Sequence, residues 1–135
     1  MPVDPGAKNS SSMDPKSIVE RFLAAQAARD SELSRTFLAD RGFTYQSPIA
    51  SFQSADDFIQ YVSFSDGIIQ ERQIRKVFVD GHDICHFLTY RIQLSEKQSI
   101  DAAQWAQVQD GRIARIEVLF DASAYRELFN GGLSA

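Results

Sequence analysis

The segment from Trp105 to Phe129 constrains the fold more than any other part of the chain. It reads WAQVQDGRIARIEVLFDASAYRELF, with alternating apolar and polar residues on both sides of Asp110-Gly111. A period of two is typical of a half-buried strand, and Asp-Gly is a frequent hairpin turn. Asp121 then offers a cap for a helix. The segment therefore predicts two antiparallel strands followed by a short C-terminal helix.

Composition indicates one domain without a basic surface. The 135 residues are 44% hydrophobic and 11% aromatic, which suffices for one buried core. The formal net charge is −4 and Lys and Arg are mostly scattered, so nucleic acid is not an expected partner. Cys85 is the only cysteine, and no Cys/His spacing indicates a metal site. We expect a cytoplasmic protein with no cofactor and no membrane association.

Residues 1–13 predict a disordered lead, because MPVDPGAKNSSSM is rich in Pro, Gly, Ser and Asn. A single domain would then span residues 14–135. Its first helix begins either at Asp14-Pro15, a cap followed by a proline, or at the capping box Ser17-x-x-Glu20. The apolar stripe of this helix comprises Ile18, Val19, Phe22 and Leu23, and Gln26 lies on the same stripe.

Two more helices and an extended segment are expected before the long strands. A second short helix follows Arg29-Asp30, and its inward residues should be Leu33, Phe37 and Leu38. Residues 43–52 are extended, and Ser47-Pro48 confines them to an edge or a bend of the sheet. Ser54 caps a third helix. The inward face of that helix comprises Phe58, Tyr61 and Val62.

Beyond the third helix the hydrophobic period changes from 3.6 to two, as far as Phe120. Turn signals at Asp80-Gly81, Ser95 to Gln98 and Asp110-Gly111 divide this stretch into four strands, which predicts an antiparallel meander. The strand around Cys85 alternates most clearly. Its inward face should comprise Ile84, His86, Leu88, Tyr90 and Ile92.

The turn at Asp110-Gly111 decides which side chains of the last hairpin face inward. A two-residue loop would put Trp105 beside Ile116. A three-residue loop with Gly111 as a G1 bulge is favoured, because it gathers small and aliphatic residues on the inner face. That inner face would comprise Gln104, Ala106, Val108, Ala114, Ile116 and Val118. The outer face predicts a homodimer contact between sheets, made by Phe87, Trp105, Arg115, Glu117 and Leu119.

This order of elements resembles the nuclear transport factor 2-like superfamily, which includes ketosteroid isomerase and the SnoaL-like polyketide cyclases. The resemblance covers about residues 15–130 and rests on RFLAAQAARDSELSRTFLADRGFTYQSP near the front and WAQVQDGRIARIEVLFD at the back. It implies an α+β fold in which a curved antiparallel sheet wraps around three N-terminal helices, as a cystatin-like cone. It also implies frequent dimerisation through the outer face of the sheet.

The resemblance implies a change at each catalytic position of the ketosteroid isomerases. The carboxylate base corresponds to Ser47, the oxyanion tyrosine to Phe22, and the protonated oxyanion aspartate to Gln104. Ser47 cannot abstract a carbon-bound proton without a strong base beside it, Phe22 has no donor, and Gln104 is a neutral amide. Nor does any strand place an inward acid beside an inward Arg, as the epoxide hydrolases of this fold require. Isomerase chemistry of the known kind is therefore not expected.

A smaller polar set in an apolar cup remains as the candidate site. His86 is suited to proton transfer near neutral pH, and Tyr90 or Gln104 could hold a developing oxyanion, so these three are the catalytic candidates. The expected ligand contacts are Phe22, Gln26, Tyr45, Ser47, Phe58, Tyr61, Leu88, Ala106, Ile116 and Val118.

Three functions of different classes stay open at this level. The first is an enzyme, an isomerase, lyase or cyclase that acts on an apolar or aromatic carbonyl compound through His86. The second is a protein that binds such a ligand without chemistry. The third is an association module whose functional surface is the outer face of the sheet. The enzyme ranks slightly ahead, because concave sites with a few convergent polar groups are the usual catalytic arrangement.

Overall fold

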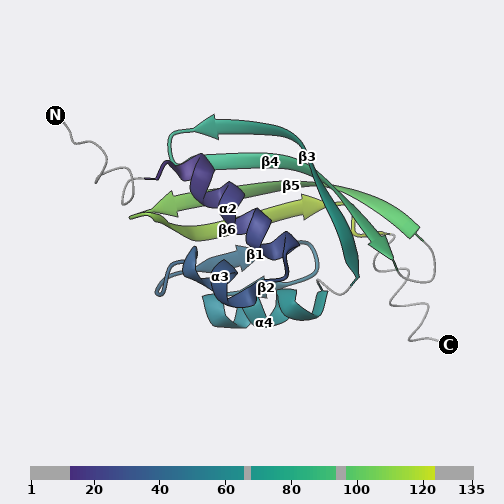
Figure 1. Cartoon of the computed structure of the whole chain (residues 1–135), viewed down its shortest axis with the longest axis horizontal. Helices are drawn as coiled ribbons and strands as arrows, with labels where there is room; N and C mark the ends of the chain where they lie inside the picture. Colours follow the sequence, from purple (N-terminus) through teal and green to yellow (C-terminus); the bar gives the residue numbers. More distant parts are fainter. Residues whose placement is uncertain (1–12, 66–67, 94–96, 124–135) are drawn as a thin grey trace.

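The computed structural model describes residues 13–65, 68–93 and 97–123. In chain order its elements are α2 (Pro15–Ala27), α3 (Ser31–Thr36), β1 (Thr44–Gln46), β2 (Ser51–Phe52), α4 (Ala55–Ser65), β3 (Ile69–Asp80), β4 (Asp83–Gln93), β5 (Lys97–Gln109) and β6 (Arg112–Phe120). The strands form one curved sheet in the order β2-β1-β6-β5-β4-β3, with α2 across its concave face (Figure 1). The predicted α+β fold is confirmed.

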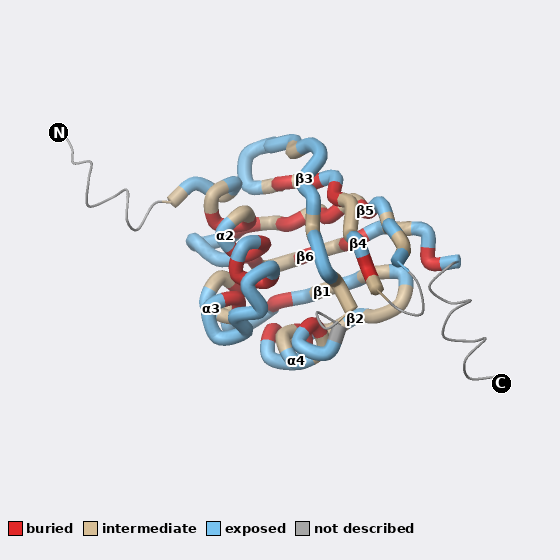
Figure 2. Tube along the Cα trace, turned by 45° about the vertical axis from the view of Figure 1, so that its right-hand side comes forward, coloured by how far each residue is buried: buried red, intermediate tan, exposed pale blue. Residues whose placement is uncertain are grey.

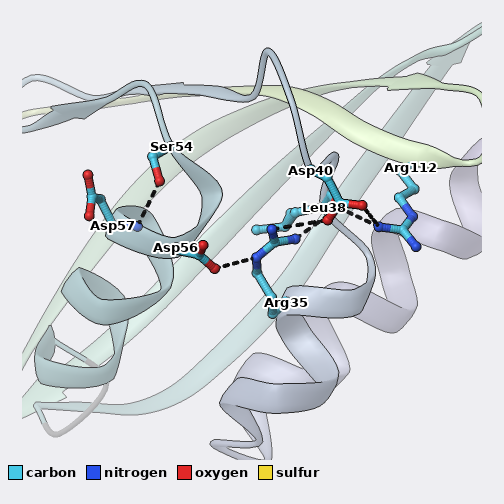
Figure 3. Close-up of polar contacts among 7 residues, drawn as sticks. All are labelled: Arg35, Leu38, Asp40, Ser54, Asp56, Asp57 and Arg112. Carbon is cyan, nitrogen blue, oxygen red and sulfur yellow. Dashed lines mark hydrogen bonds and ion pairs between the residues drawn. The ribbon is translucent and has the colours of Figure 1, made fainter.

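Side-chain caps fix where the helices begin. Oδ1 of Asp14 accepts from the backbone N–H of Ser17 at 2.7 Å, so α2 uses the first of the two expected starts. Ser54 caps α4, because its Oγ accepts from the N–H of Asp57 at 3.3 Å (Figure 3). The prediction that Leu33 of α3 faces inward was wrong, because this residue is 46% exposed. This six-residue helix turns Ser34 inward instead.

Two arginines that share Asp40 join α3 and α4 to the sheet (Figure 3). Nε of Arg35 in α3 donates to Oδ1 of Asp56 in α4 at 2.7 Å, and its Nη2 donates to Oδ1 of Asp40 at 3.1 Å. Nη1 of Arg112, at the start of β6, donates to Oδ2 of the same Asp40 at 3.1 Å. Because one carboxylate serves both arginines, this cluster holds α3, α4 and the last hairpin together.

The sheet is mixed, which corrects the expectation of a wholly antiparallel one. The four long strands are antiparallel, but β1 runs parallel to β6, with Tyr45 beside Ile116. β1 turns back into β2 around Pro48, and β2 forms the edge of the sheet, where a nearby proline costs no ladder hydrogen bond. The sheet is therefore open rather than a closed barrel.

The last hairpin combines features of both expected turns. Gln109 pairs with Arg112, and Asp110 and Gly111 have φ of 53° and 78°, so the loop has two residues and the favoured three-residue loop was wrong. A β-bulge at Ala114 then shifts the register by one residue. The expected inner residues Gln104, Ala106, Val108, Ile116 and Val118 are buried, whereas Ala114 is only half-buried and Ile113 is buried instead.

The core lies between α2 and the concave face of the sheet, where buried and exposed positions alternate along the strands (Figure 2). Ile84, His86, Leu88 and Ile92 are buried on the inner face of β4, as expected. Met13, which we assigned to the lead, packs against this core. The rest of that lead, residues 1–12, and the final helix with its stop, residues 124–135, lie outside the described residues.

Candidate functional site

A cavity of about 100 Å³ opens between α2, α4 and the inner face of the sheet. One water needs roughly 10–15 Å³, so the cavity can hold several waters or a small organic molecule. The expected residues that line it are Gln26, Tyr45, Ser47, Phe58, Tyr61, Tyr90, Gln104 and Val118. The expected residues that do not line it are Phe22, His86, Leu88, Ala106 and Ile116, all of them buried in the core.

Several lining residues were not expected from the sequence. They are Ile49, Val62, Ile68, Ile69, Arg72, Ile92, Ile100 and Phe120. Ile92 shares the inner face of β4 with Tyr90, so its alternation was a usable signal. Arg72 had none, because the register between β3 and β4 brings it opposite Tyr90. Its guanidinium carbon lies 5.9 Å from the centre of the Tyr90 ring, a cation–π contact at the cavity wall.

Aromatic rings of β1 and α4 line one wall of the cavity, and a ring of β2 packs against them. The rings of Tyr45 in β1 and Phe58 in α4 stack with centroids 4.4 Å apart. Phe52 in β2 packs against Tyr61 in α4 at 5.0 Å. Packed rings of this kind hold one another in place, so this wall is a preformed apolar surface. It favours a ligand with an apolar or aromatic body.

Ser47 has a structural task in the turn around Pro48. Its Oγ accepts from the backbone N–H groups of Ile49 and Ala50, both at 3.2 Å, and donates to the carbonyl of Ala50 at 3.4 Å. These bonds engage the hydroxyl with the turn itself. Ser47 therefore shapes the cavity wall and does not act as a base.

The most polar part of the site lies deeper, where α2 meets β4 and β5. Nε2 of His86, a fully buried side chain, lies 3.4 Å from Oε2 of Glu20 in α2. Burial lowers the pKa of His86, and the hydrogen bond and charge of Glu20 partly oppose that shift. Within the described ranges, Nδ1 of His86 and Nε2 of Gln104 are buried without a hydrogen-bond partner. Buried nitrogens of this kind normally have partners, so each is expected to bind a water, a ligand or, through a water, the other nitrogen.

The remaining chemistry of the described segments is sparse. No group of three His, Cys, Asp or Glu side chains in residues 13–65, 68–93 and 97–123 is placed to hold a metal ion. No helix in the same ranges is long and apolar enough to cross a membrane. Cys85 lies on the outer face of β4, where burial raises the pKa of its thiol.

Comparison with solved structures identifies the fold. The chain is similar to an NTF2-like protein of unknown function from Cytophaga hutchinsonii (TM-score 0.68, 22% identity, 85% of this chain and 94% of that one). It is also similar to a Mycobacterium tuberculosis LEH-like epoxide hydrolase (0.72, 19%, 89% and 92%). A third likeness is to a candidate SnoaL-like polyketide cyclase from Jannaschia sp. CCS1 (0.74, 12%, 84% and 89%). No family model and no curated protein matches the sequence.

These likenesses, with the curved sheet and its cavity, define the class of fold. The chain adopts the nuclear transport factor 2-like fold, as the resemblance in its sequence implied. At such low identities the likeness establishes the arrangement of helices and strands. The function of the cavity depends on the residues that line it.

Proposed function

We propose that the protein binds a small apolar or aromatic molecule in the cavity and holds one polar group of that molecule at Gln104. The carrying observation is the amide of Gln104, which is 4% exposed, lines the cavity, and has a side-chain nitrogen without a partner in the part of the chain described. A buried amide without a partner costs about 1–3 kcal/mol. A ligand in the cavity can pair with whichever end of the amide faces it, and so recover part of the cost of burying the amide.

Chemistry on the ligand is the second candidate function. The specific observation in its favour is the Glu20–His86 contact, because a carboxylate beside an imidazole is a common arrangement for proton transfer. An isomerase, lyase or cyclase that acts on an apolar or aromatic carbonyl compound would use His86 as its base. The names of two similar structures, an epoxide hydrolase and a candidate polyketide cyclase, support small-molecule chemistry on this fold. His86 does not line the cavity, which favours binding alone.

Titration of the full chain with toluene tests the binding function. We expect a saturable interaction with a Kd of about 1 mM or tighter, within the range that a ligand of this size can reach. Backbone amide NMR signals of Tyr45, Tyr61 and Val118 should shift, because these residues surround the cavity. Shifts confined to the outer face of the sheet would refute the proposal, and no saturation would show that the apolar wall alone does not hold a ligand. Recovery of an altered compound after incubation with carbonyl substrates would favour the enzyme.

We also propose that a second copy of the chain covers the outer face of the sheet, as the sequence predicts for Phe87, Trp105, Arg115 and Glu117. Phe78 and Leu119 are 54% and 59% exposed there, a costly exposure for a monomer. Beside them, the guanidinium of Arg115 lies 4.5 Å from the Trp105 ring centre. The Trp105 indole also donates to Asp83 at 2.9 Å, so this surface is ordered in one chain. A cytoplasmic location is proposed with it, because the free Cys85 thiol fits a reducing compartment.

Exchange of Leu119 for arginine tests this association. The side chain points away from the core, so Leu119→Arg should fold normally while placing two opposed guanidinium groups in a symmetric contact. Sedimentation velocity should show a dimer for the natural chain and a monomer for the variant. Phe64→Arg, on the exposed side of α4, is the matched control and should leave the dimer intact. A natural chain that sediments as a monomer would contradict the proposal.

A further inference from the structure

His86 and Gln104 lie opposite each other on neighbouring strands. The register between β4 and β5 pairs them, and both are buried on the inner face of the sheet. Opposite residues in antiparallel strands have Cβ atoms about 4.5–5.5 Å apart, which brings two such side chains within reach of one bridging water. One nitrogen of each has no partner among the described residues, Nδ1 of His86 and Nε2 of Gln104. The two unsatisfied nitrogens therefore belong to adjacent side chains.

The contact with Glu20 decides what Nδ1 of His86 can do. Oε2 of Glu20 lies 3.4 Å from Nε2 of His86, and a carboxylate only accepts hydrogen bonds, so Nε2 carries the proton. Burial lowers the pKa of His86 from its ordinary 6.5, so the ring is neutral at pH 7. In a neutral imidazole with the proton on Nε2, Nδ1 is an acceptor. Nδ1 therefore needs a donor, and the Nε2 of Gln104 is one.

We infer that Nδ1 of His86 accepts from Nε2 of Gln104 through one bridging water, and that this contact turns the carbonyl oxygen of Gln104 toward the cavity. The two polar ends of an amide point in different directions, so a nitrogen held at His86 leaves the oxygen to face the ligand. In keeping with this, Nε2 of Gln104 is fully buried, although the Gln104 side chain lines the cavity. Glu20 and His86 are then positioning residues for Gln104.

This orientation names the class of ligand, and it rests on the proposed function of the cavity. A carbonyl oxygen accepts, so the site selects an apolar molecule with a hydroxyl or N–H donor. A carbonyl compound fits only when it also carries such a donor, because two facing oxygens repel and leave both acceptors unpaired. The position that corresponds to a proton-donating acid in the ketosteroid isomerases thus has the reverse polarity in this chain.

A matched pair of compounds tests the selection, with the full chain and isothermal calorimetry. 1-Phenylethanol carries a hydroxyl where acetophenone carries only a carbonyl, and the two have the same size and apolar body. We expect the alcohol to bind about five- to tenfold more tightly, as one hydrogen bond predicts. Gln104→Leu should remove this preference. Glu20→Lys, which can only donate, should move the proton to Nδ1 and reverse it, whereas Arg21→Ala on the same helix should leave it unchanged.

A spectroscopic measurement checks the orientation independently of any ligand. Long-range proton–nitrogen correlations of the His86 ring should show the proton on Nε2 in the natural chain and on Nδ1 in Glu20→Lys. A proton on Nδ1 in the natural chain, or acetophenone bound as tightly as the alcohol, overturns the inference and leaves the cavity as a binding site. Failure of toluene and of both compounds to bind overturns the proposed function together with the ligand preference.

Discussion

Phe58→Ala should lower the free energy of unfolding by about 3–5 kcal/mol, a large part of the roughly 5–15 kcal/mol that a domain of this size has. Phe58 is buried, and its ring contacts those of Phe22, Phe43 and Tyr45, with centroids 6.4, 5.5 and 4.4 Å away. Removing the ring leaves an empty volume that these neighbours cannot fill without leaving their own contacts. Urea denaturation followed by circular dichroism measures the loss.

The same change should also alter the cavity, because Phe58 lines it. We expect Phe58→Ala to bind naphthalene, which is larger than toluene, more tightly than the natural chain does. Both proteins are compared in the folded state, without urea. Phe64→Ala is the matched control, since Phe64 lies on the same helix and is 80% exposed. It should change stability by no more than about 0.5 kcal/mol. A loss below about 1 kcal/mol for Phe58→Ala would contradict the central place given to this ring.

Val118→Phe should weaken toluene binding by about 100-fold or more, because the larger side chain occupies the space of the ligand. Val118 is a buried residue of β6 that lines the cavity, and a phenyl ring there extends into the space that the preformed aromatic wall encloses. Overpacking of this kind costs roughly 1–3 kcal/mol of stability, less where a cavity receives the added atoms. The fold should therefore persist while binding is lost.

Val79→Phe provides the comparison for this substitution. Val79 is 53% exposed on β3, so the same exchange there adds volume outside the cavity and should leave toluene affinity unchanged. The Val118→Phe variant should also sediment as the natural chain does. Retained toluene binding in Val118→Phe would show that the ligand lies elsewhere, and loss of self-association together with binding would show that cavity and outer face are not independent.

The fold was accessible from the sequence because local signals agreed with one another. Asp14-Pro15 and Ser54 mark helix starts whose hydrogen bonds the structure contains. The alternation in β4 placed His86 and its neighbours inward correctly. Leu33 was misplaced because a helix of six residues has too few turns for its apolar spacing to decide which side faces the core.

The site was only partly accessible, because its lining depends on pairings between distant segments. Nothing local in β3 indicates that Arg72 lies opposite Tyr90, so the sequence alone does not place Arg72 at the cavity wall. Likewise the parallel pairing of β1 with β6 brings Tyr45 beside Ile116 across some seventy positions of chain. The alternation in β4 correctly predicts that His86 faces inward. It does not indicate that His86 lies behind the cavity wall, outside the lining.

The one extra residue at Ala114 has a consequence for how the chain can change in length. Because Ala114 is an extra residue in β6, Ile113 before it and Ile116 after it both face the interior, although they are an odd number of positions apart. A strand that continued regularly from Ile113, without the bulge, would bring Leu119 inward and send Val118 to the surface, exchanging the inner and outer faces of the sheet along half a strand. Deletion of Ala114 should therefore leave both faces in place, because Gln107 would still pair with Arg115 and Gln104 with Val118. The bulge makes this part of β6 tolerant of the loss of one residue.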